Sequence, residues 1–147
     1  MRKTLVLGCV ASLFATGVAA QSAIEIQRAV YLQKKTQQAG RIVHSLEPAE
    51  RLRRGDSVVL MLEWSAPGRS RSFAVSSRVP RDLAFQRSNG RQAEVSVDNG
   101  RNWGRLGVLR TGARKAAPED VTHVRWMVSD AEAAFGSGMM TYSAIVR

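Results

Sequence analysis

An octapeptide near the middle of the chain, residues 96–103, combines residue types that can bind one another or a ligand. Its pattern is Ser-x-Asp-x-Gly-x-x-Trp. An aspartate in a turn accepts backbone N–H groups, a glycine adopts the left-handed conformation that other residues avoid, and a tryptophan presents a large flat ring. We therefore expect Asp98 to close a turn with its side chain, Gly100 to have a positive φ, and Trp103 to pack back over the loop.

This octapeptide resembles the Asp-box hairpin, which is best known as a repeated element of bladed, glycan-processing enzymes. The resemblance makes Trp103 and Arg101 candidate ligand contacts. Trp64 and Trp126 fall on strand faces that we expect to point inward, so Trp103 is the tryptophan to test for stacking on a sugar. A propeller needs several blades of about 40 residues, and the motif occurs here once. It therefore predicts one structural hairpin.

No set of residues with catalytic or metal-binding spacing accompanies the octapeptide. The two histidines, His44 and His123, lie far apart in sequence, and neither His-Glu-x-x-His nor Cys-x-x-Cys occurs. Residues 136–138 do not form the Gly-x-Ser-x-Gly elbow of hydrolases. The aspartates and glutamates of the turns match no calcium loop. The sequence thus predicts no catalytic residue, no metal and no cofactor.

The first twenty residues have the layout of a secretory signal. Arg2 and Lys3 precede an apolar run, and small residues lead up to Ala20, after which we expect cleavage. Cleavage would remove Cys9, the chain's one cysteine, so the mature protein would have neither a disulfide nor a thiol nucleophile. No later segment is long and apolar enough to span a membrane. The expected location is periplasmic or secreted.

The mature chain would comprise residues 21–147 and fits one domain. Without Arg2 and Lys3 it has 20 basic against 12 acidic residues, a net charge of +8, and most of the basic residues are arginines. Arginine forms forked contacts with carboxylates and phosphates, so an acidic envelope protein or an anionic glycan is a conceivable partner. Codon bias on a solvated surface is the alternative explanation. Export argues against a dedicated nucleic-acid partner.

Short runs of alternating apolar and polar residues fill the chain from Ser57 onward, which is the period of half-buried strands. Further short strands are expected at 83–85 and 93–97, with a turn at Asn89–Gly90 between them. A return strand is expected at 103–109. A polar connection should follow at 111–120, and a helical turn or loop at 131–138. Upstream, 24–32 and 41–46 are weaker strands, and we expect 33–39 to fray. The residues expected to share one face of their strand are Val58, Leu60, Leu62 and Trp64; Phe73 and Val75; Val124, Trp126 and Val128; Met140, Tyr142, Ala144 and Val146; and, in the first strand, Ile24, Ile26, Arg28 and Val30.

Roughly seven to nine short strands at this spacing favour an antiparallel β-sandwich of immunoglobulin type. Several segments together resemble the bacterial conserved-repeat surface domain, known as domain-of-unknown-function family eleven, over residues 46–147. The resemblance identifies a divergent, single-domain member, and it implies an immunoglobulin-like module of exported or cell-envelope proteins without catalytic residues. The segments that carry it are Arg54-Gly55-Asp56, Val79-Pro80 with Leu83 and Phe85, Val95 to Gly100, Asp120 to Trp126 and Tyr142 to Arg147.

The sequence therefore predicts an exported, non-enzymatic β-sandwich that acts as a structural or binding module of the cell envelope. The alternatives are a carbohydrate-binding accessory protein or a glycan-active enzyme that uses the Asp-box region.

Overall fold

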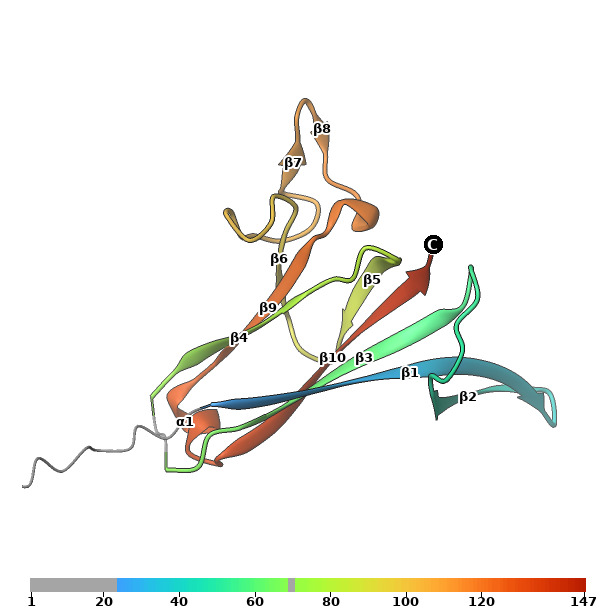
Figure 1. The fold of residues 1–147 in the computed structure, drawn as a ribbon, viewed down its shortest axis with the longest axis horizontal. Coiled ribbons are helices and arrows are strands. Elements are labelled where there is room, and N and C mark those ends of the chain that lie inside the picture. Colours follow the sequence, from blue (N-terminus) through green and yellow to red (C-terminus); the bar gives the residue numbers. More distant parts are fainter. Residues whose placement is uncertain (1–23, 69–70) are drawn as a thin grey trace, which may run out of the picture.

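Ten antiparallel strands make up most of the molecule, eight of them in two packed sheets and two in a separate small hairpin (Figure 1). The computed structural model describes residues 24–68 and 71–147, and the strand count refers to these. The predicted signal segment, residues 1–20, and its cleavage after Ala20 lie outside them. The prediction of an all-β sandwich is confirmed. In chain order the elements are β1 (Glu25–Gln38), β2 (Arg41–Pro48), β3 (Ser57–Ser65), β4 (Phe73–Arg78), β5 (Leu83–Asn89), β6 (Glu94–Ser96), β7 (Arg110–Thr111), β8 (Arg114–Lys115), the 3-10 helix η1 (Pro118–Asp120), β9 (His123–Val128), α1 (Asp130–Ala133) and β10 (Ser137–Val146).

The larger sheet has the strand order β2-β1-β3-β10-β5, and the smaller one has the order β4-β9-β6. A third pair, β7 and β8, forms a small hairpin at the tip of the long connection between β6 and β9 (Figure 1). Strands β3 and β9 lie in the interior of their sheets. This position explains why their inward faces are apolar throughout, because an interior strand has a neighbour on both sides and the opposite sheet over one face.

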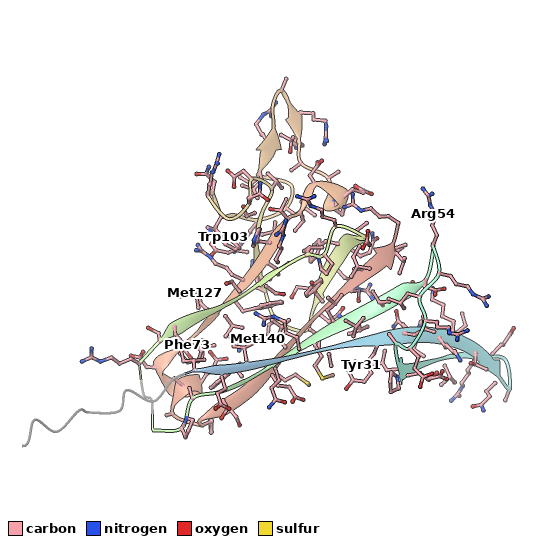
Figure 2. The ribbon with its side chains drawn as sticks, viewed as in Figure 1. Tyr31, Arg54, Phe73, Trp103, Met127 and Met140 are labelled. Atoms are coloured by element: carbon pink, nitrogen blue, oxygen red, sulfur yellow. The ribbon has the colours of Figure 1, made fainter. Side chains whose placement is uncertain are left out.

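The core lies between the two sheets, where the predicted inward faces meet. Leu62 and Trp126 are 1% exposed, and Tyr142 is fully buried. The ring of Trp64 meets Phe73 edge-on, with 5.1 Å between the ring centroids. Figure 2 shows Phe73 and Met140 in the space between the sheets. The alternation of apolar and polar residues therefore predicted the core strands correctly.

The prediction that residues 33–39 fray is wrong, because β1 continues without interruption to Gln38. Its second half pairs with β2 in register, from Tyr31 opposite Pro48 to Gln38 opposite Arg41. Ala39 and Gly40, with φ of 48° and 76°, make the two-residue turn between them. Two successive left-handed residues match the twist of a hairpin. Polar side chains are tolerated in this part of β1 because the ribbon is exposed on both faces.

The predicted return strand at 103–109 is also wrong. After the octapeptide only Gly104 pairs with the strand it follows, through a single bridge to Val95. The chain then turns, with the backbone N–H groups of Val108 and Leu109 both donating to the carbonyl of Arg105. Gly107 has a φ of 97° and allows this turn. The local turn hydrogen bonds thus replace a sheet ladder that sequence alternation alone had suggested.

Candidate functional site

The Asp98 carboxylate closes the turn that connects β6 to the rest of the octapeptide. Its Oδ1 atom accepts the backbone N–H groups of Arg101 at 3.1 Å and Asn102 at 2.9 Å, and it also accepts the Ser96 hydroxyl at 2.7 Å. Its Oδ2 atom accepts the Asn102 side-chain amide at 2.6 Å. These hydrogen bonds favour the ionised form, those from Asn102 most strongly, and they lower the pKa of Asp98 to about 2. Both oxygens of this carboxylate therefore accept hydrogen bonds from residues of the loop itself.

Gly100 and Trp103 complete the turn in the manner the octapeptide predicts. Gly100 has a φ of 82°, and its backbone N–H donates to the Ser96 hydroxyl at 2.9 Å. The Trp103 indole donates its Nε1–H to the Gly100 carbonyl at 3.0 Å. A Cβ atom on Gly100 would lie 3.5 Å from the Trp103 ring. Glycine therefore satisfies both the backbone conformation and the close approach of the indole.

The ring of Trp103 already has neighbours on the outer surface of the small sheet. The Arg125 guanidinium carbon lies 4.5 Å from its ring centroid, which is cation–π geometry. His123 meets the ring edge-on, with 6.3 Å between centroids. Glu94, opposite Arg125 in register, fixes the guanidinium through a 2.7 Å ion pair. Trp103 thus connects the loop to strands β6 and β9. These contacts reduce the ring surface that it can offer to a sugar.

Arg101, the other candidate contact, is exposed at the tip of the turn. Within the described parts of the chain its side chain takes part in no ion pair; only its backbone N–H is bonded, to Asp98. The structure therefore separates the two candidates. Trp103 is in contact with other residues of its own protein, whereas Arg101 has no charged partner among residues 24–68 and 71–147.

The two histidines lie on different sheets. His44 is on the exposed strand β2, whereas His123 is half-buried on β9. Burial lowers the pKa of His123, and the nearby Arg78 lowers it further. Its Nδ1 atom lies 3.1 Å from the Thr122 hydroxyl, which also accepts the backbone N–H of Asn99 in the octapeptide. His123 is therefore part of the support of the turn.

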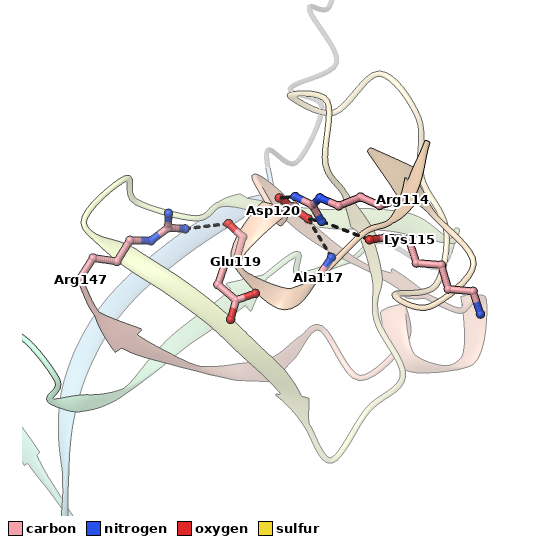
Figure 3. Close-up of polar contacts among 6 residues, drawn as sticks. All are labelled: Arg114, Lys115, Ala117, Glu119, Asp120 and Arg147. Atoms are coloured by element: carbon pink, nitrogen blue, oxygen red, sulfur yellow. Dashed lines mark hydrogen bonds and ion pairs between the residues drawn. The ribbon is translucent and has the colours of Figure 1, made fainter. Parts of the chain in front are cut away.

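Two arginines contact η1, one through the Asp120 carboxylate and one through the backbone carbonyl of Glu119 (Figure 3). Asp120 receives both terminal nitrogens of Arg114, at 2.6 and 2.7 Å, and the backbone N–H of Ala117 at 2.8 Å. These contacts, the Arg114 side chain first, lower the pKa of Asp120 to about 2. Arg147 donates to the Glu119 carbonyl at 2.8 Å. Through these contacts β8 and the last residue are both bonded to η1.

Sequence reasoning did not identify a projecting surface at the opposite end of the molecule. We call it the arm and define it as residues 31–48, where β1 and β2 pair with each other (Figure 1). Every residue of β2 is exposed, including Ile42 at 68%, Leu46 at 47% and Val43 at 42%. The signal that could have revealed it is Gly40 between the two expected strands at 24–32 and 41–46, because a glycine in a short connection between two strands favours a hairpin.

The fold and the turn define a class: a small antiparallel β-sandwich with one Asp-box turn and one projecting hairpin. No family model matches the chain, no curated protein matches it, and no solved structure matches it. Over residues 24–68 and 71–147, no helix is long and apolar enough to cross a membrane. The same residues contain no group of three or more histidine, cysteine, aspartate or glutamate side chains that could hold a metal ion.

Proposed function

We propose that this protein is an exported, non-enzymatic binding module of the bacterial cell envelope, and that the arm is its contact surface for a protein partner. The observation that carries this proposal is the exposure of β2, an edge strand whose apolar side chains Ile42, Val43 and Leu46 all face solvent. The resemblance to the conserved-repeat surface domain motivates the envelope location, and this family assignment is part of the proposal.

Two physical arguments support a partner at the arm. An isolated two-stranded hairpin is only marginally stable in water, so a ribbon that projects from its sandwich gains stability when another chain covers it. A free edge strand also presents unpaired backbone groups, to which a partner strand can add. Folded proteins usually protect such edges, which makes a long exposed one a candidate for recognition.

The charge of the arm indicates the chemistry of the partner. Lys34, Lys35 and Arg41 are basic, and Glu47 is already paired with Lys34 at 2.6 Å. An acidic protein surface with an accessible strand fits this arrangement, because complementary charge speeds association and fixes the register of the added strand. The alternative partner is an anionic glycan that contacts Arg101. In that case the Asp-box region, and not the arm, would be the contact surface.

A site-specific photo-crosslinker at position 42 tests the proposal in cells, with position 108 as the matched control because Val108 is 76% exposed and lies outside the arm. We expect one envelope protein to crosslink from position 42 and not from 108. With that partner purified, Ile42→Glu should weaken binding by about tenfold or more, as expected for an apolar contact in an interface, and Val108→Glu should leave it unchanged.

Three results would overturn the proposal. The first is crosslinking that does not distinguish positions 42 and 108. The second is partner binding that is insensitive to Ile42→Glu. Turnover of peptides, esters or glycans by the purified protein is the third, because it would contradict a non-enzymatic role.

A further inference from the structure

A groove of about 390 Å³ lies between β1 of the large sheet and β4, the edge strand of the small sheet. Its walls include Val30 from β1, Leu60 and Leu62 from β3, and Pro80 after β4. Small-molecule sites commonly have volumes of roughly 300–1,000 Å³. The groove is therefore large enough for a small ligand, and its lining is mostly apolar.

The groove exists because the small sheet does not fully cover β1. On the inward face Arg28 lies opposite Leu62 and Val30 lies opposite Leu60. Leu60 and Leu62 are 8% and 1% exposed, whereas Val30, on the same face of the sheet, is 36% exposed. One side of the hydrophobic core thus remains accessible beside β4.

Arg28 is an unusual residue for this face. It belongs to the row of inward-facing β1 residues, beside Ile26 and Val30, and it lines the groove. In the described part of the chain no carboxylate forms an ion pair with it. A guanidinium above an apolar surface, without a counter-ion, is a suitable receptor for a carboxylate.

The buried hydroxyl of Tyr142 is a second observation at this place. The side chain is fully buried, and its hydroxyl has no hydrogen-bond partner among the described residues. Burial raises the pKa of Tyr142 to about 12, and the nearby Ser77 hydroxyl and the positive charge of Arg28 act against this rise. The Ser77 hydroxyl itself donates to the Arg78 carbonyl at 3.3 Å, so it leaves the Tyr142 hydroxyl without a hydrogen bond among the described residues. Tyr142 lies opposite Leu60, one of the groove's wall residues, in the register of β10 and β3, and buried polar groups without a partner are rare in native proteins.

We propose that the groove binds a small anionic amphiphile, a carboxylate on an apolar chain. The chain would pack on Val30, Leu60 and Leu62, and the carboxylate would pair with Arg28. Ser77, which also lines the groove, adds a hydroxyl group that can bond the polar end. The arm of a second copy of this protein does not fit this site, because its Lys34 and Lys35 would approach Arg28 with the same charge. The groove lies outside the arm, so this inference is independent of the proposed function.

Calorimetric titration of the purified mature protein with decanoate, kept below the concentration at which it forms micelles, tests the proposal. We expect one decanoate per protein. Decanol, which has the same chain without the charge, should bind at least about tenfold more weakly, because a charge-assisted pair contributes more than 1.4 kcal/mol, the equivalent of a factor of ten.

Variants locate the site. Arg28→Gln should weaken decanoate binding by about tenfold or more, whereas Arg54→Gln, the same change on a loop side chain that points away from the body of the molecule (Figure 2), should not. Val30→Asp should also abolish binding, since it places an anion in the groove, and Val108→Asp is its control. Thermal unfolding of each variant checks that the fold is retained.

The proposal is wrong if decanoate does not bind, if decanol binds equally well, or if Arg28→Gln and Val30→Asp leave the affinity unchanged. Binding of an extended acidic peptide without binding of decanoate would also overturn it, and would instead assign the groove to strand addition along β4.

Discussion

Replacement of Tyr142 by phenylalanine should stabilise this protein. The change removes a buried hydroxyl that has no hydrogen-bond partner among the described residues and keeps the ring, whose centroid lies 5.9 Å from Phe85 and 6.3 Å from Trp126. A buried polar group left unsatisfied costs about 1–3 kcal/mol. We therefore expect Tyr142→Phe to raise the free energy of unfolding at pH 7 by about 1 kcal/mol, the lower end of that range.

The same residue makes an additional prediction at alkaline pH. Its pKa rises from 10.0 to about 12 in the folded state, so the unfolded chain loses this proton first and stability falls as the pH rises from 10 toward 12. At pH 11 the difference between the two ionisation equilibria corresponds to about 1.4 kcal/mol, one pKa unit. The wild-type protein should lose this amount relative to pH 7, in addition to any loss that it shares with Tyr142→Phe.

Urea denaturation at pH 7 and pH 11 measures both effects. Tyr31→Phe is the matched control, since it removes the hydroxyl of a half-buried tyrosine at the base of the arm. We expect it to change stability little at either pH. The reasoning is refuted if Tyr142→Phe unfolds at lower urea than the wild type at pH 7, or if both proteins lose the same free energy between pH 7 and pH 11.

Three further predictions concern the turn and the core. Gly100→Ala should destabilise the protein by more than ~1 kcal/mol in urea denaturation, because alanine is strained at a φ of 82°; an unchanged midpoint would contradict the role of Gly100. Asp98→Asn should flatten the acid side of the stability profile: the lowered pKa of about 2 means that the wild type loses stability as the pH falls from about 4 toward 2, and a variant with the same acid profile would refute this. Gly138→Ala should cost about 1–3 kcal/mol and lower the melting temperature, since its Cβ atom would lie 2.6 Å from Trp64 Nε1, and a wild-type melting temperature would show that the indole can move aside.

The core strands illustrate what alternation in a sequence can predict. In β3, Val58 and Trp64 occupy the buried face because residues two apart in a strand point to the same side. The Asp-box turn is predictable for a related reason. The hydrogen bonds of Asp98 reach only four residues along the chain, so the local order of residue types is sufficient to define them.

The two corrected predictions have the opposite cause. Whether residues 33–38 extend β1 depends on the strand that returns beside them, and the polar residues there carry no alternation to indicate it. Whether 103–109 form a strand depends on competition between a ladder to β6 and the local turn at Arg105. Where the local preference for a strand is weak, the presence or absence of a neighbouring strand decides whether a strand forms.

The sequence by itself determined the all-β class, the inward faces of the central strands and the geometry of the turn at Asp98, because each follows from contacts between residues that are close along the chain. Only the tertiary structure placed Arg125 on Trp103, left β2 exposed along the arm, and put Arg28 beside an open part of the core. These features depend on which strands become neighbours across and between the sheets. The register of β1 against β3 makes Arg28 an inward-facing residue, and the narrower small sheet leaves it accessible.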